Sequence, residues 1–227
     1  MTITRIDSLQ QVTWIRRFPA ERRIATDRTY QILKRAMDLG IVLLTAPFWL
    51  PLLAGVSLAV WLTAPKAPVI FYHLRTGKGG KRFRMYKFRT MVPNAEELKA
   101  KYAHLNELKW PDFKITNDPR VTFLGRILRK TSLDELPQLL NVLRGDMSLV
   151  GPRPTSFGAE TYQLWQTERL DVVPGLTGLW QVEGRGSIEF DERLRLDIAY
   201  IERASLLLDI EILFRTVIAV FQQRGAK

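Results

Sequence analysis

The sequence predicts an α+β protein: a compact, mostly helical domain that carries a short β-hairpin and is attached to a membrane helix. Three observations predict this class: an uncharged stretch of 27 residues at 39–65, two strand-like segments around a glycine-rich turn, and leucines at helical spacing further on. The 227 residues suffice for one ordinary domain and a membrane element. We therefore divide the chain into a basic N-terminal segment (1–33), a membrane helix (34–65) and a domain outside the membrane (66–227).

The composition limits the chemistry. Lys and Arg number 34 against 23 Asp and Glu, and the formal net charge of +11 predicts a negatively charged partner such as phosphate or anionic lipid. An apolar share of 46% is too high for a disordered chain. The chain has no cysteine, which excludes disulfides, thiolate-bound metals and thiol nucleophiles, and two histidines are too few for a histidine-rich metal site. Carboxylates, arginines, lysines, hydroxyls and amides must carry any reaction.

The N-terminal segment combines charge with scattered apolar residues. Residues 1–37 hold eight Lys or Arg among side chains such as Trp14, Ile15 and Phe18. This pattern suits an amphipathic helix that lies on a membrane beside anionic lipid, and it equally suits a solvated basic helix. The sequence leaves both interpretations open.

The uncharged stretch is long enough for a membrane. At about 1.5 Å per residue, a straight helix of this length would reach roughly 40 Å, more than a hydrocarbon core. Pro47 and Pro51 lie inside it, and each removes a backbone donor, which bends or breaks a helix. Lys34 and Arg35 precede it, and eight basic residues with no acid follow at 66–89. Because basic flanks favour the cytoplasmic side, a re-entrant helix is favoured over a single crossing, and a buried core helix is the remaining alternative.

Two short strands follow. Residues 69–72 and 83–88 are rich in aromatic and branched side chains, and the second segment alternates apolar with basic residues. The glycine-rich segment 76–80 predicts a hairpin turn, which we favour over a phosphate cradle because the P-loop pattern is missing. Residues 94–109, rich in Ala, Glu, Leu and Lys, predict a solvated connecting helix.

The richest stretch lies in the middle of the chain and brings carboxylates and arginines together. Ser132 and Glu135 have the spacing of a capping box before a leucine-rich helix, which places Asp134 and Glu135 in the first helical turn. The two acids can simply stabilise that helix end. Arg129 upstream, and Arg153 in a rigid Gly-Pro-Arg-Pro loop downstream, favour a second interpretation. In it Asp134 attacks phosphorus as a nucleophile, Glu135 holds a divalent metal ion, and the arginines bind phosphate.

The last third of the chain carries weaker signals. Trp180 and Arg185 lie in a loop with turn glycines, and a core tryptophan in a plain loop is the commoner meaning of such a composition. Asp197 and Asp209 are compatible with solvation, with pairing to a nearby arginine, and with a place in the site. The apolar segment 206–221 is too charged to span a membrane and predicts a helix that packs on the domain or lies at the membrane surface as an interfacial amphipathic helix.

Several of these segments form an ordered series of motifs. They are Lys34-Arg35 with Asp38, Lys87-Phe88-Arg89-Thr90-Met91, Ser132-Leu133-Asp134-Glu135-Leu136-Pro137-Gln138, Asn141-Val142-Leu143, Gly151-Pro152-Arg153-Pro154, Pro174-Gly175-Leu176-Thr177-Gly178 and Trp180-Gln181-Val182. Over about residues 31–221 the chain resembles the bacterial sugar transferases, also called monotopic phosphoglycosyl transferases. The number and order of the motifs make this resemblance specific.

The resemblance implies a function and a site. Members of this family transfer a sugar phosphate from a nucleotide diphosphate sugar, here expected to be a UDP-sugar, to polyprenyl (undecaprenyl) phosphate and release UMP. The reaction begins exopolysaccharide, O-antigen or glycoconjugate synthesis at the cytoplasmic face of the bacterial inner membrane. By resemblance, Asp134 and Glu135 are the catalytic pair of a ping-pong reaction with an aspartyl-phosphosugar intermediate, and Mg²⁺ binds at Glu135. Arg129 and Arg153 match positions near phosphate, and Arg185 matches the nucleotide end.

The resemblance extends to the membrane helix, which in the family is re-entrant and broken at a proline. Here the break falls at Ala46-Pro47, where relatives often have Ser-Pro, so Thr45 is the remaining hydroxyl that can reach a freed carbonyl. His73 stands where relatives commonly have Gln. Many longer relatives carry further transmembrane helices, and we expect this chain to be the compact form, with a truncated longer protein as the alternative.

Two other classes of function remain as alternatives. The charge and the aromatic residues of 83–88 suit a nucleic-acid binder, but such a protein has no need of the uncharged stretch, so we expect no nucleic-acid partner. The other class is a non-catalytic scaffold in which the acidic pair only caps a helix. The expected partners are the UDP-sugar, the polyprenyl phosphate and membrane lipids. The sequence leaves open the identity of the sugar, the polyprenol length and the oligomeric state, a homodimer included.

Overall fold

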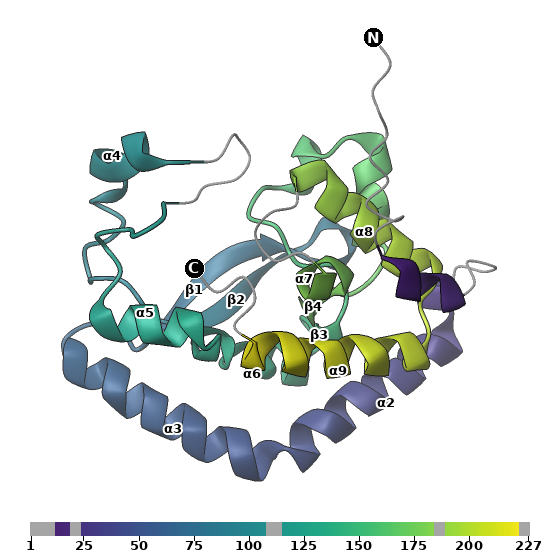
Figure 1. The fold of residues 1–227 in the computed structure, drawn as a ribbon, viewed down its shortest axis with the longest axis horizontal. Helices are drawn as coiled ribbons and strands as arrows, with labels where there is room; N and C mark the ends of the chain where they lie inside the picture. The colour runs from purple at the N-terminus through teal and green to yellow at the C-terminus, as the bar shows by residue number, and fades with distance from the viewer. Residues whose placement is uncertain (1–11, 19–23, 108–114, 184–188, 223–227) are drawn as a thin grey trace.

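The computed structural model describes residues 12–18, 24–107, 115–183 and 189–222. Most of them form a mixed domain, and two helices project from one side of it (Figure 1). The helices are α2 (Arg28–Leu44), α3 (Ala46–Thr63), α4 (Lys99–Tyr102), α5 (Phe123–Lys130), α6 (Gln138–Arg144), α7 (Leu179–Glu183), α8 (Phe190–Glu202) and α9 (Leu206–Phe221). The strands are β1 (Ile70–Thr76), β2 (Arg82–Phe88), β3 (Ser148–Val150) and β4 (Gly175–Thr177). Short 3₁₀ turns lie at Thr13–Arg17, Ile24–Thr26, Lys78–Gly80, Ala103–Leu105, Leu133–Glu135, Ala159–Thr161 and Leu164–Leu170. The predicted α+β class is confirmed.

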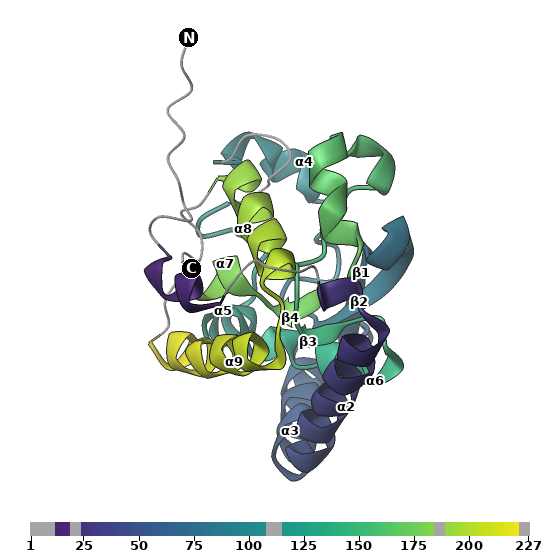
Figure 2. The same ribbon diagram turned by 90° about the vertical axis from the view of Figure 1, so that its right-hand side faces the viewer.

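The two projecting helices, α2 and α3, form a V. Helix α2 ends at Leu44 and α3 begins at Ala46, with Pro47 in its first turn, where the missing N–H would have had no helical partner. Pro51 lies inside α3 without ending it. The tip of the V is its point farthest from the domain, and seen from the side the pair forms a narrow wedge (Figures 1 and 2).

Side chains satisfy backbone carbonyls at the bend between these helices. Thr45 Oγ1 donates to the carbonyl of Ile41 at 2.7 Å, which also accepts the Thr45 backbone N–H, and Oγ1 lies 3.3 Å from the carbonyl of Val42. The indole N–H of the buried Trp49 donates back across the bend to the carbonyl of Val42 at 2.9 Å. In apolar surroundings an unpaired carbonyl costs roughly several kcal/mol, so these donors stabilise the bend.

Within the described part of the chain, α3 is the one helix long and apolar enough to cross a membrane. Only 17% of it is buried by the rest of the protein. Large apolar side chains therefore face outward along it, such as Phe48 at 80% exposure and Leu62 at 63%. A buried core helix, which the sequence left as an alternative, is wrong, because such a helix would be covered on all sides.

The β1–β2 hairpin matches the predicted strands. The strands pair antiparallel, with Phe71 opposite Lys87. Since side chains alternate along a strand, His73 shares the face of Phe71 and Lys87. The connection contains the 3₁₀ turn Lys78–Gly80, in which Gly79 has a φ of 62°, a left-handed conformation that favours glycine. The glycines of this segment therefore serve a turn, as predicted.

A second sheet, which the sequence did not predict, pairs β3 with β4 in parallel. Each strand has three residues, too few for a periodic pattern to be visible. Gly151 and Gly175 allow the two segments to approach, because a Cβ added at Gly175 would lie 2.1 Å from the backbone nitrogen of Gly151. This contact fixes the direction in which the Gly-Pro-Arg-Pro loop leaves β3.

The predicted connecting helix over 94–109 is shorter in the structure. Its described residues form only α4 and the 3₁₀ turn Ala103–Leu105. Most side chains of this segment are exposed, so no apolar face packs against the domain. Helix propensity alone does not sustain a longer helix there.

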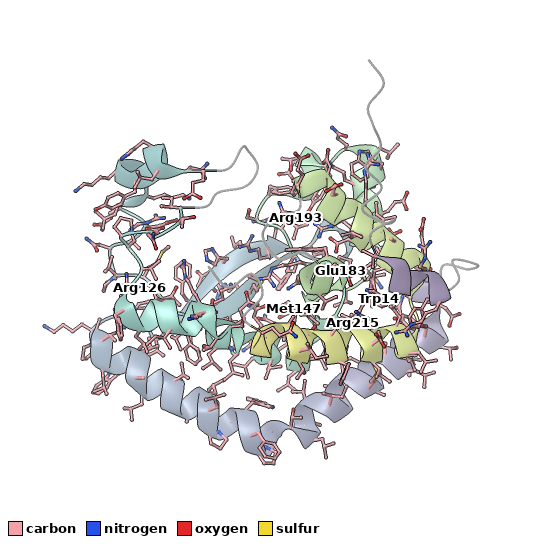
Figure 3. The ribbon with its side chains drawn as sticks, in the orientation of Figure 1. Trp14, Arg126, Met147, Glu183, Arg193 and Arg215 are labelled. Atoms are coloured by element: carbon pink, nitrogen blue, oxygen red, sulfur yellow. The ribbon has the colours of Figure 1, made fainter. Side chains whose placement is uncertain are left out.

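The N-terminal segment also differs from its prediction. Within 12–18, Val12 and Ile15 are buried in the core at 3% and 2% exposure, so this part neither lies free in solvent nor rests on lipid alone. The indole of Trp14 donates to Glu183, and the Arg215 guanidinium lies 4.0 Å from the Trp14 ring centroid (Figure 3). Contacts with residues about 170 to 200 positions away in the chain hold this segment, which no local pattern reveals.

A buried carboxylate joins α2 to the C-terminal helices. Asp209 on α9 accepts hydrogen bonds from the hydroxyls of Tyr200 at 2.6 Å and Tyr30 at 3.1 Å, and it pairs with Lys34 Nζ at 2.8 Å. Of the roles left open for Asp209, pairing with a cation is correct, although the cation is a lysine of α2. This network fixes the first arm of the V against the domain.

Helices α5 and α9 lie along the side of the domain from which the V projects (Figures 1 and 2). The predicted packing of 206–221 on the domain is confirmed, because Leu208 and Ile212 are fully buried. A second apolar face of α9 stays exposed, formed by Leu207, Ile210, Phe214, Val217 and Ile218. On α5, Phe123 and Ile127 are likewise exposed, at 74% and 45%.

Candidate active site

A cavity of about 1030 Å³ opens between the hairpin, α5, α7 and α9. Charged side chains that face one another line one part of it: Lys87, Arg129, Asp134, Glu135 and Arg153. Apolar side chains make up other walls, among them Phe71, Leu139, Leu149, Leu176, Leu213 and Val220. The cavity therefore offers a charged and an apolar surface to a ligand.

The two acids do not form the predicted helix cap. Asp134 and Glu135 lie in the 3₁₀ turn Leu133–Glu135, and α6 begins only at Gln138. Ser132 has a left-handed backbone with a φ of 59°, and its side chain caps no helix. The capping-box prediction is therefore wrong, because the Glu135 carboxylate binds two cations instead of the Ser132 backbone. The turn directs two successive carboxylates into the cavity.

Lys87 and Arg153 hold Glu135. Oε1 of Glu135 accepts hydrogen bonds from Lys87 Nζ at 2.7 Å and from the Arg153 guanidinium, whose Nη1 lies 3.4 Å from Oε2. Burial alone would raise the pKa of Glu135, but the charges of Arg153 and Lys87 hold this pKa below its usual range. Glu135 is thus a carboxylate throughout the ordinary pH range.

Asp134 has a different environment. It is buried at 7% exposure, and its one polar partner within the described residues is Lys87, whose Nζ lies 3.5 Å from Oδ2. Burial raises the pKa of Asp134 and the charge of Glu135 adds to this, while Lys87 opposes both. A carboxylate with few donors around it keeps its lone pairs available for attack on an electrophile.

Arg129 reaches the cavity from α5. Its Nε donates to Thr90 Oγ1 at 3.0 Å, and its two terminal nitrogens have no partner among the described residues. Gly125 allows this approach, because a Cβ there would lie 2.0 Å from the Thr90 carbonyl oxygen. The outer edge of the guanidinium is consequently available for an anion.

A buried ion pair lies behind Arg153. Arg169 Nη2 lies 2.6 Å from Asp197 Oδ2 and also donates to the Arg153 carbonyl. Burial raises the pKa of Asp197 to about 6, and the charge of Arg169 opposes this rise. Of the roles left open for Asp197, pairing is correct, but with an arginine that the sequence analysis did not single out.

Other predicted residues have different outcomes. Trp180 lines the cavity, so it is more than a core tryptophan. His73 lines it too; its side chain is exposed, and partial loss of hydration beside the cations of the cavity lowers the pKa of His73. Arg185 lies outside the described residues, and its role at the nucleotide stays a prediction. Lys87 was missed, although the alternation of β2 places it on the same face as the buried Met85.

The acidic pair fits a magnesium ion. No group of three or more His, Cys, Asp or Glu side chains suited to a metal occurs in the described part of the chain. Mg²⁺, however, commonly takes one or two carboxylates and completes its shell with water and substrate phosphates. Glu135 Oε2, with only a 3.4 Å contact, and the neighbouring Asp134 supply such a donor set.

Comparisons with known proteins identify the family of the chain. The chain matches the family described as bacterial sugar transferase over residues 29–223. It is 45% identical over 204 residues to the undecaprenyl-phosphate galactose phosphotransferase of Salmonella typhimurium, covering 88% of this chain and 42% of that protein. It is 38% identical over 204 residues to the exopolysaccharide production protein ExoY of Rhizobium meliloti, covering 88% and 87%. A third relative, the UDP-N-acetylgalactosamine-undecaprenyl-phosphate N-acetylgalactosaminephosphotransferase of Aeromonas hydrophila, is 37% identical over 207 residues, covering 87% and 46%. The chain thus spans less than half the length of the Salmonella and Aeromonas proteins.

Proposed function

Because the chain belongs to the bacterial sugar transferase family, we propose that it transfers a sugar phosphate from a UDP-sugar to undecaprenyl phosphate and releases UMP. Relatives named as undecaprenyl-phosphate phosphotransferases for galactose and N-acetylgalactosamine support this proposal. The observation that carries it is the placement of Asp134 and Glu135 on one turn, at the charged part of a cavity with apolar walls. A diphosphate suits the charged part, and an isoprenoid chain suits the apolar walls.

The proposed reaction has two displacements at one phosphorus atom. A carboxylate oxygen of Asp134 attacks the phosphorus that bears the sugar, a new P–O bond forms, and the P–O bond to the other phosphate breaks so that UMP leaves with the electron pair. An oxygen of the polyprenyl phosphate then attacks the same phosphorus, and the bond to Asp134 breaks. The carboxylate is thereby regenerated, and neither displacement requires a proton on Asp134.

Cations of the site can bind the phosphates of such a donor. Lys87, Arg129 and Arg153 line the cavity around Asp134 and Glu135. Guanidinium groups can contact phosphate through two parallel hydrogen bonds, and the free edge of Arg129 is suited to this. Mg²⁺ held at Glu135, with Asp134 beside it, would supply further charge neutralisation for the diphosphate.

The membrane attachment is part of the proposal. We place the tip of the V, at Ala46-Pro47, inside the lipid and both basic flanks on the cytoplasmic side. The exposed apolar side chains of α3, α5 and α9 support this arrangement, because these three helices lie on one side of the molecule (Figure 1). A cavity lined by α9 would then lie near the lipid that carries the acceptor.

The topology has a direct test, because the chain has no cysteine. Single cysteines at Arg28, before the V, and at Lys66, after it, should react with a membrane-impermeant maleimide from the same side of sealed vesicles. Labelling from opposite sides would establish a single crossing and contradict the re-entrant arrangement.

The activity test compares wild type with Asp134→Asn in nanodiscs that contain undecaprenyl phosphate and Mg²⁺. Wild type should release UMP from one or two members of a UDP-sugar panel, and Asp134→Asn should release none while melting at nearly the same temperature. Glu97→Gln is the matched control, because Glu97 is exposed and does not line the cavity. Equal release by Asp134→Asn would remove Asp134 from the mechanism, and no release from any donor would contradict the proposed function.

The metal requirement has its own test in the same assay. Excess chelator should stop UMP release, and added Mg²⁺ should restore it. Full activity in chelator would contradict metal binding at Glu135.

A further inference from the structure

A buried ion pair holds the backbone of Arg153 through its carbonyl. Arg169 donates to the Arg153 carbonyl, and Asp197 in turn holds the Arg169 guanidinium. The two side chains pair with each other at 2.6 Å and are 4% and 1% exposed. They come from the 3₁₀ turn Leu164–Leu170 and from α8, so three separate segments of the chain meet here.

The contacts of Arg169 are not those expected of an ion pair that serves stability alone. Its Nη1 donates to the hydroxyl of Tyr162 at 3.1 Å, while its Nε is buried without a hydrogen-bond partner among the described residues. A buried ion pair is often no more stabilising than apolar side chains of the same volume, because both charges lose their hydration. A donor left unpaired adds to this cost. Stability alone therefore does not explain the pair.

The held residue, Arg153, contacts Glu135 of the catalytic pair. Prolines on both sides of Arg153 restrict its backbone, and its guanidinium donates to Glu135 and, at 3.3 Å, to the Leu176 carbonyl. Arg153 lines the cavity, whereas Arg169 and Asp197 do not. A displaced Arg153 backbone would move the guanidinium relative to Glu135 and to any phosphate bound beside it.

We propose that Arg169 and Asp197 are positioning residues, which set the place of the Arg153 guanidinium for the donor diphosphate without touching the substrate. The inference rests on the proposed sugar phosphate transfer. Misplacing a catalytic contact by about 1 Å can cost about 100-fold in rate, so the pair should influence turnover from behind the cavity wall.

The test is a double-mutant cycle with Arg153→Ala. The pair variant Arg169→Met/Asp197→Leu removes both buried charges together, and Arg169→Lys keeps the charge but cannot reach Asp197, Tyr162 and the Arg153 carbonyl at once. Each change is made in the full chain, alone and combined with Arg153→Ala. UMP release gives kcat and KM for the donor, calorimetry gives the affinity for UDP, and thermal melting reports folding.

Both changes should lower kcat/KM by about 10- to 100-fold, raise the donor KM and weaken UDP binding. The pair variant should melt close to the wild-type temperature. In the Arg153→Ala background the same changes should alter kcat/KM by less than about twofold, because they act through a side chain that is already absent. A matched control on the last turn of α8, Arg203→Met/Glu202→Gln, disrupts an ion pair of 3.2 Å outside the cavity and should leave kcat/KM unchanged.

Three results would overturn the inference. The first is an unchanged kcat/KM in both variants, and the second is a loss of equal size with and without Arg153. The third is a variant that melts early and loses kcat at constant KM and UDP affinity, which would show a structural role only. If the pair variant does not fold, Arg169→Lys alone decides. If the proposed function is wrong, wild type will release no UMP, and this result is separate from the outcome of the cycle. The double-mutant cycle can then still be evaluated from the UDP affinities of the variants.

Discussion

Lys87→Met should change the pH dependence of turnover, because Lys87 is the nearest cation to the proposed nucleophile. Its Nζ lies 3.5 Å from Asp134 Oδ2. Opposite unit charges at 3.5 Å attract by about 1 kcal/mol in bulk water and by about 5 kcal/mol at an effective dielectric constant of about 20. Loss of this attraction disfavours the ionised carboxylate, so removal of the cation should raise the pKa of Asp134.

The sign follows from the proposed chemistry. Attack on phosphorus requires the ionised carboxylate, so turnover rises with pH as Asp134 loses its proton. In wild type, burial already raises the pKa of Asp134 above 3.8, and Lys87 limits that rise. In Lys87→Met the acidic limb of the pH–rate profile should therefore move to higher pH by at least about one unit. Lys87→Arg keeps the charge and should return the limb close to its wild-type position.

The assay is UMP release at low donor concentration from about pH 5 to about pH 9, at constant ionic strength, for wild type, Lys87→Met and Lys87→Arg. The deficit of Lys87→Met should be largest at low pH and shrink as the pH rises. A deficit of equal size at every pH, with an unmoved acid limb, would refute the electrostatic reasoning and leave Lys87 a contact for the substrate alone.

Three further predictions concern the fold and the membrane. Gly125→Ala should destabilise the protein by about 1 to 3 kcal/mol and lower its melting temperature, because the new Cβ would lie 2.0 Å from a backbone carbonyl oxygen; Gly40→Ala, with open space around it, should not. Trp49→Phe removes the shorter of two hydrogen bonds to the Val42 carbonyl and leaves the 3.3 Å one from Thr45 Oγ1, so unfolding in detergent should become easier by about 1 kcal/mol. Trp61→Phe serves as a control at an exposed indole, and equal stability of the two would argue against the bond. Phe214→Glu, on the exposed face of α9, should reduce retention on anionic lipid vesicles in flotation, and unchanged retention would contradict a lipid-facing α9.

The acidic pair shows how tertiary contacts override a local pattern. The spacing of Ser132 and Glu135 predicts a capping box, which is a contact between residues three positions apart. In the structure, Glu135 instead binds Lys87, 48 positions away, and Arg153, 18 positions away. Two cations stabilise a half-buried carboxylate more than one backbone N–H does, and α6 begins only at Gln138.

The sequence by itself determined the features that depend on residues close together in the chain. These are the α+β class, the hairpin, the uncharged stretch of membrane length, and an acidic pair between arginines. Only the tertiary structure decided which distant side chains meet. It brought Lys87 to the carboxylates, paired β3 with β4, and set Arg169 and Asp197 behind Arg153. The physical reason is that periodicity and turn chemistry act over a few residues, whereas a buried charge selects its partners from the whole folded chain.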